Sequence, residues 1–114
     1  MIYRARYIKS IFIESRAWFD KTGGNTYFSA RISLDGKLIG VLPFQYGYGS
    51  QFETAALEWL KANEVINHEH RTLHELEDYG VNLYSVQYWT TKAEAIRFVA
   101  LGNVSLAPLP AWQV

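Results

Sequence analysis

Residues 26–44, TYFSARISLDGKLIGVLPF, contain the pattern that decides the fold. The first part alternates strictly, which predicts a β-strand with one buried face and one face that is wet or functional. The buried face holds Phe28, Ala30, Ile32 and Leu34, and the opposite face holds Tyr27, Ser29, Arg31 and Ser33. Asp35-Gly36 is a strong hairpin signal, so KLIGVLPF is predicted to be an antiparallel strand whose pairing ends at Pro43.

The segment before this hairpin predicts another strand. IFIESRAWFD (11–20) is rich in β-branched and aromatic residues, and the KTGGNT that follows supplies the glycines of a hairpin loop. In the expected register, Arg16 and Trp18 lie on the same face as Tyr27 and Arg31. We therefore expect a small basic and aromatic surface on one face of the sheet.

An aromatic, glycine-spaced loop leads from the third strand into a helix, in LPFQYGYGSQFETAALEWL (42–60). Ser50 and Glu53 have the spacing of a capping box, in which each side chain satisfies a free N–H of the first helical turn. The sequence therefore predicts a helix from about Gln51 to Asn63.

Three more elements complete the expected fold. A short helix ends at Gly80, VNLYSVQYWT (81–90) reads as a fourth strand, and KAEAIRFVAL forms a last helix capped by Thr91. We expect residues 1–114 to form a single α+β domain, with an antiparallel sheet of about four strands and two or three helices packed on one face. The tail NVSLAPLPAWQV is apolar and is expected to pack on the domain or on a neighbouring subunit.

Composition narrows the functional classes. The chain has 114 residues, of which 49% are hydrophobic, so it can bury a core. Basic and acidic residues number 11 each, which makes an extended nucleic acid or an acidic membrane an unlikely partner. Cysteine is absent, which excludes disulfides and thiolate metal sites. With no apolar run of membrane-span length, a cytoplasmic protein is expected.

The glycine-aromatic loop is the first candidate site. Tyr46 and Tyr48 can stack on a base, and a helix N-terminus attracts an anion. The alternative is a tight turn with packed tyrosines. It is supported by the capping box, whose side chains would already bind the free N–H groups of the first helical turn. The loop matches no Walker or dinucleotide motif. The candidate ligand-binding residues are Arg16, Trp18, Tyr27, Arg31, Tyr46, Tyr48 and Ser50.

Catalytic chemistry has less support in the sequence. His70 and His74 have the i, i+4 spacing of a metal pair on a helix, with Glu77 one turn on, but a solvated polar helix face is the favoured explanation. The H-E-x-x-H and G-x-S-x-G patterns are missing. We predict no catalytic residue, no metal and no cofactor.

Two runs, SRAWFDKTGGNTYFSARI and LPFQYGYGSQFETAALEWL, resemble segments of small proteins encoded by bacteriophages, for which no activity is assigned. The resemblance covers about the first half of the chain. It implies a phage accessory protein that acts in the cytoplasm of a bacterial host. Small phage proteins often counter host defence, by sequestering a signalling nucleotide or by masking a host protein.

Three functional hypotheses follow. The favoured one is a non-enzymatic binder of a small anionic, nucleotide-like ligand, acting as a homo-oligomer with pockets between subunits. The alternative is an inhibitor that masks a host protein through its aromatic residues and apolar tail. The third is a small metal-dependent hydrolase that uses His70 and His74.

Overall fold

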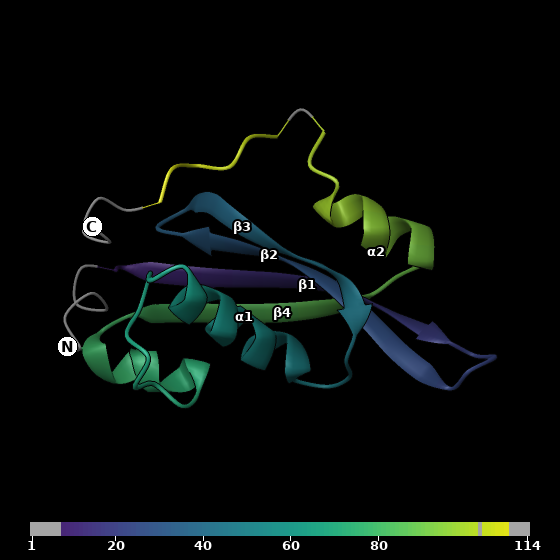
Figure 1. The fold of residues 1–114 in the computed structure, drawn as a ribbon, viewed down its shortest axis with the longest axis horizontal. Coiled ribbons are helices and arrows are strands. Elements are labelled where there is room, and N and C mark those ends of the chain that lie inside the picture. The colour runs from purple at the N-terminus through teal and green to yellow at the C-terminus, as the bar shows by residue number, and fades with distance from the viewer. Residues whose placement is uncertain (1–7, 103, 110–114) are drawn as a thin grey trace.

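A four-stranded sheet organises the computed structural model, which describes residues 8–102 and 104–109 (Figure 1). The spatial order of the strands is β3-β2-β1-β4. The strands are β1 (Ser10–Asp20), β2 (Asn25–Leu34), β3 (Lys37–Tyr46) and β4 (Asn82–Trp89). The helices are α1 (Gln51–Ala62), the 3-10 helix η2 (Leu73–Tyr79) and α2 (Lys92–Val99). The predicted α+β class is confirmed.

The sheet is mixed, although most of it is antiparallel. β2 pairs antiparallel with both β1 and β3, as the two hairpins predict, whereas β4 runs parallel to β1. Parallel strands need a long crossover connection, and α1 and η2 supply it between β3 and β4. None of the helices in the described part of the chain has the length and apolarity needed to cross a bilayer.

The Asp35-Gly36 turn forms as predicted and also fixes the start of β1. Both residues have positive φ values, 50° and 81°, as the primed hairpin turn requires. The Oδ1 atom of Asp35 accepts hydrogen bonds from the backbone N–H groups of Lys9 and Ser10, at 2.8 and 2.9 Å. One carboxylate therefore joins the β2–β3 turn to the beginning of the neighbouring strand.

The prediction that pairing ends at Pro43 is wrong. β3 continues to Tyr46, and its register with β2 shifts between Phe28 and Ala30, where the strand passes through Pro43. β3 is an edge strand, and a proline is tolerated on an edge or at a bulge because no ladder hydrogen bond is lost.

The hydrophobic core lies between the sheet and α1. The residues predicted for the buried face of β2 are all buried, and η2 closes the core beyond α1. The residues that α1 and η2 contribute are Phe52, Ala56, Leu57, Leu60, Leu73 and Leu76. Gly80 ends η2 with a φ of 85°, as predicted.

The start of α1 is at Gln51, as predicted, but the capping box is not formed. The Ser50 side chain makes no cap hydrogen bond, and its φ and ψ of −85° and 10° differ from the extended conformation of a capping residue. The Glu53 carboxylate instead accepts a hydrogen bond from the Ser85 hydroxyl. Glu53 therefore ties α1 to β4.

α2 crosses the opposite face of the sheet, so the helices cover both faces and not one. The Ser29 hydroxyl donates to the carbonyl of Ala95 at 2.5 Å, and Arg31 Nε donates to the carbonyl of Phe98 at 2.7 Å. The carbonyl of Phe98 has no partner within a helix that ends at Val99, so Arg31 satisfies it. At the other end, Thr91 Oγ1 accepts from the N–H of Glu94 at 3.2 Å, as predicted.

Replacing Gly40 of β3 by alanine is expected to lower the free energy of unfolding by about 1–3 kcal/mol, because the added Cβ would overlap the indole of Trp59. Urea unfolding followed by far-UV circular dichroism measures the loss. In a Trp59→Leu background the same substitution should cost clearly less, since the ring is gone. An equal loss in both backgrounds would contradict the overlap as its cause.

Candidate ligand-binding site

A continuous row of aromatic rings lies on the α2 face of the sheet, beside α2. We call it the aromatic row, and it consists of Trp18, Tyr27, Phe44, Tyr46 and Tyr48. The ring of Tyr27 stacks on Phe44 with centroids 5.5 Å apart and an angle of 14°. Trp18 and Tyr46 lie 5.9 Å from Tyr27, and Tyr48 lies 6.4 Å from Tyr46. These spacings are those of favourable aromatic pairs.

Strand pairing determines the position of the aromatic row. Trp18 is opposite Tyr27 in the β1–β2 register, and Tyr27 is opposite Tyr46 in the β2–β3 register. The inner rings are partly buried, whereas Tyr46 and Tyr48 are 57% and 59% exposed. The row therefore ends in two rings that are open to solvent.

The ammonium group of Lys92 lies over the other end of the row. Lys92, the first residue of α2, places Nζ 5.5 Å from the centroid of the Trp18 ring. Ammonium groups at this distance from an indole are attracted by the ring. The candidate site thus combines ring faces with one positive charge.

The two candidate arginines have a different role, because both guanidinium groups lie over the ring of Phe98. Their Cζ atoms are 4.2 Å (Arg16) and 4.3 Å (Arg31) from its centroid. Arg16 is also paired with Glu14 at 3.0 Å, and Arg31 is bonded to the carbonyl of Phe98. The arginine charges therefore attach α2 to the sheet and do not form an open anion site.

The glycine-spaced loop is a packed turn in its backbone. A Cβ at Gly47 would come within 2.5 Å of the Phe28 ring, and the Gly47 N–H donates to the carbonyl of Thr26 at 3.0 Å. The N–H of Tyr48 donates to Oε1 of Gln51 at 2.8 Å. The backbone fits the tight-turn alternative, while the ring of Tyr48 stays exposed.

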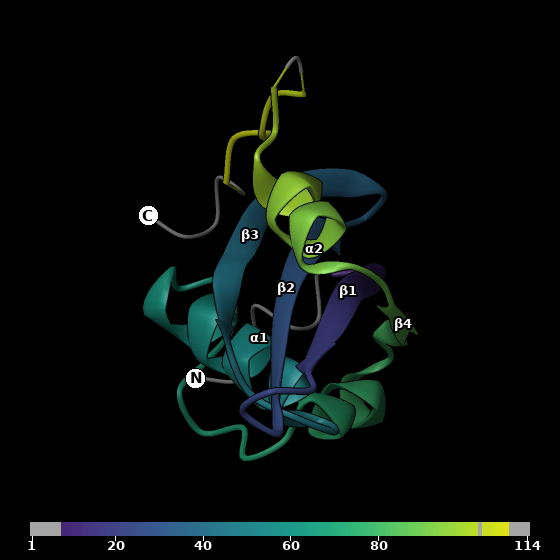
Figure 2. The ribbon, with the colours of Figure 1, turned by 90° about the vertical axis from the view of Figure 1, so that its right-hand side faces the viewer.

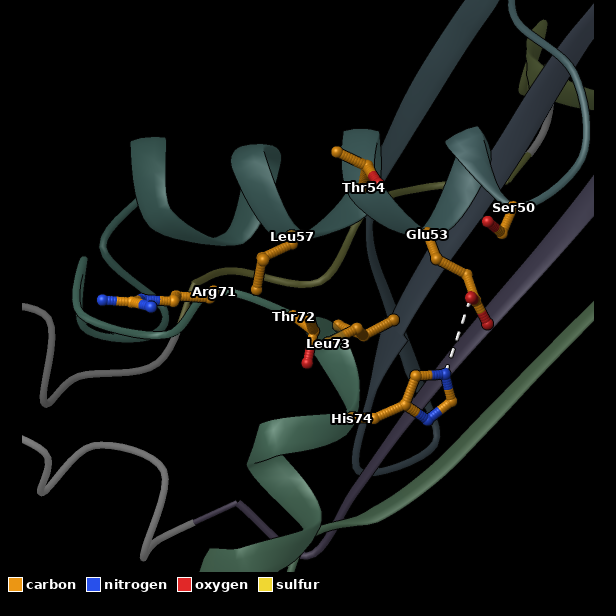
Figure 3. Close-up of a pocket in the computed structure, with 8 residues that line it drawn as sticks. All are labelled: Ser50, Glu53, Thr54, Leu57, Arg71, Thr72, Leu73 and His74. Carbon is orange, nitrogen blue, oxygen red and sulfur yellow. Dashed lines mark ion pairs between the residues drawn. The ribbon is translucent and has the colours of Figure 1, made fainter.

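Ser50 lines a separate pocket between α1 and η2, on the α1 side of the sheet (Figure 3). The pocket has a volume of about 200 Å³, with Arg71 at one end and Glu53 beside His74 at the other, as Figure 3 shows. Leu57 and Leu73 lie between these ends. Ser50 therefore does not belong to the same site as the aromatic row.

The two histidines do not form the predicted pair on one helix face. His74 lies between two carboxylates, with Nε2 3.5 Å from Glu53 and Nδ1 3.4 Å from Glu77. His70 precedes the 3-10 helix and is buried, with its ring edge-on to Tyr79 at 5.3 Å. Within residues 8–102 and 104–109, no group of three His, Asp or Glu side chains is placed to hold a metal ion.

Four of the seven candidate residues therefore meet in one row, namely Trp18, Tyr27, Tyr46 and Tyr48. Sequence reasoning missed Phe44 because it ended the strand at Pro43, although Phe44 lies two residues before Tyr46, the spacing of one strand face. Lys92 carried no local signal, since only the position of α2 brings it to Trp18.

Replacing Phe98 by leucine should lower the free energy of unfolding by about 1–3 kcal/mol, because both cation–π contacts are lost while apolar volume is kept. Chemical denaturation measures the effect. Ile96→Leu, at an exposed position of the same helix, is the matched control and should stay within about 0.5 kcal/mol. Equal stability of Phe98→Leu and the wild type would show that the cation–π contacts of the arginines do not stabilise the packing of α2.

Compared with models of known protein families, with curated proteins and with solved structures, the chain gives no significant match. The interpretation of function therefore depends on the chain's own side chains and their geometry.

Proposed function

We propose that this chain is a non-enzymatic binding protein whose aromatic row takes the flat ring of a small anionic, nucleotide-like ligand. The observation that supports the proposal most strongly is the unbroken series of ring contacts across three strands, which ends in the exposed rings of Tyr46 and Tyr48. Rings held in place by their neighbours lose little freedom when a base stacks on them.

In this proposal, stacking on the aromatic rings supplies the binding affinity, and the charge of Lys92 supplies the preference for an anionic ligand. Base–aromatic stacking contributes about 1–3 kcal/mol per base and tolerates different bases. Lys92 supplies the positive charge beside the row, because Arg16 and Arg31 are engaged with Phe98. One ammonium group favours a ligand with a single phosphate over a long polyanion.

The proposed mode of action is sequestration, without conversion of the ligand. The resemblance of the first half of the chain to phage proteins suggests the setting, a bacterial cytoplasm in which a phage product removes a host signalling nucleotide. A sequestering protein needs only a surface and a sufficient concentration, and the aromatic row provides such a surface.

A second candidate function is the masking of a host protein. The apolar tail supports it, since Val104, Leu106 and Leu109 are exposed while the N–H of Ala107 donates to the carbonyl of Leu38 at 2.7 Å. Exposed apolar side chains held against an edge strand are suited to a protein contact.

A thermal-shift screen with mono-, di- and cyclic nucleotides tests the first proposal. A ligand present at 100 times its dissociation constant adds about 2.7 kcal/mol of stability, which raises Tm by several degrees in a domain of this size. Tyr48→Ala should remove most of the shift. Tyr84→Ala is the matched control, because Tyr84 has the same exposed fraction of 59% but lies on β4, outside the row.

Two results would count against nucleotide binding at the aromatic row. One is the absence of a shift with every nucleotide, which would direct the search to host proteins. The other is a shift of equal size in Tyr48→Ala and Tyr84→Ala, which would place any bound nucleotide away from the row.

A further inference from the structure

The two edges of the sheet are protected very differently. On the β3 edge lie Lys37, the irregular register at Pro43, and a backbone hydrogen bond from Ala107 to Leu38. β4, NLYSVQYW, has no charged residue and no proline, and its register with β1 is continuous. Charges, prolines and bulges are the devices that keep edge strands from pairing, so β4 is the unprotected edge.

The backbone groups that point outward from β4 follow from its bonds to β1. The N–H groups of Asn82 and Thr90 donate to carbonyls of Lys9 and Ala17, on the β1 side. Because successive residues of a strand turn their backbone groups to opposite edges, the even-numbered residues bond to β1. The odd-numbered residues face outward, and they are Leu83, Ser85, Gln87 and Trp89. Figure 2 shows β4 at the outer edge of the sheet.

We propose that β4 pairs antiparallel with β4 of a second copy of this chain, about a two-fold axis at Val86. In this register Leu83 is opposite the second copy's Trp89, and Ser85 is opposite its Gln87. All the outward-facing residues then lie in hydrogen-bonded pairs, each of which exchanges two backbone hydrogen bonds. Val86 meets its own copy in a non-hydrogen-bonded pair.

The side chains are self-complementary in this register. On the α2 face Tyr84 lies against Tyr88 of the second copy, and Val86 lies against Val86. On the α1 face an apolar pair (Leu83 with Trp89) is followed by a polar pair (Ser85 with Gln87). Aromatic and apolar cross-strand pairs stabilise antiparallel strands, and no like charges meet.

Neighbouring registers fit less well. A shift of two residues places Leu83 against Gln87 and Ser85 against its own copy, and Trp89 is left without a partner among the four. The exposure of the monomer agrees with the proposed contact, because Tyr84, Tyr88 and Trp89 are 59%, 55% and 68% exposed. The second copy would cover these rings and continue the sheet, as isologous dimers do.

Single cysteines test both the dimer and its register, since the chain contains no cysteine. In Val86→Cys the two thiols would lie on the two-fold axis, where Cα atoms about 4.5 Å apart are within the range of a disulfide. We expect a disulfide-linked dimer on a non-reducing gel after mild oxidation. Tyr84→Cys is the matched control on the same strand and face; its copies would be offset by four residues, about 13 Å along the strands, so it should stay unlinked.

Native mass measured over a range of concentrations completes the test. The wild type should be a dimer, and Val86→Lys should be a monomer with an unchanged far-UV spectrum, because two ammonium groups would meet on the axis. Ile96→Lys, at an exposed position of α2, should stay dimeric. A monomeric wild type, a dimer that Val86→Lys leaves intact, or equal cross-linking of Val86→Cys and Tyr84→Cys would overturn the proposal.

Discussion

The structure depends on the need to cover both faces of β2. Its apolar side chains require a hydrophobic layer, which α1 provides with Phe52, Ala56 and Leu60. Its other face carries Ser29 and Arg31, whose donors would be costly to bury without acceptors. α2 supplies those acceptors as the carbonyls of Ala95 and Phe98. One strand with two chemically different faces thus determines where both α-helices lie.

The elements formed by local chemistry were predictable from the sequence. Asp35-Gly36 predicted the turn, alternation predicted the two faces of β2, and Gly80 predicted the end of η2, since each depends on neighbouring residues only. The direction of β4 and the face chosen by α2 were not predictable. They depend on which strand β4 joins, and strand pairing is a contact between distant residues.

The candidate site likewise has one part that was predictable from the sequence and one part that was not. Trp18 and Tyr27 come together because the β1–β2 register follows from their hairpin turn, whereas Tyr46 comes opposite Tyr27 only through the register shifts between β2 and β3. The contacts of Arg16 and Arg31 with Phe98 could not be predicted from the sequence, since Phe98 is far from both along the chain. The capping box predicted from Ser50 and Glu53 likewise does not form, because the Glu53 carboxylate accepts a hydrogen bond from Ser85 of β4. A polar side chain can bond to residues that are distant along the chain, whereas the neighbours of an aromatic residue in a strand are set by the pairing of adjacent strands.

The parallel pairing of β1 with β4 also has a consequence for the order of folding. The hydroxyl of Ser15 donates to Oε1 of Gln87 at 2.9 Å, and 72 positions separate the two residues. Closing so long a loop is slow compared with forming adjacent hairpins. The β1–β2–β3 meander is therefore expected to assemble first, and the backbone groups on the outer edge of β1 stay unpaired until β4 pairs with them. During that interval the chain exposes an unpaired strand edge, and such edges promote aggregation.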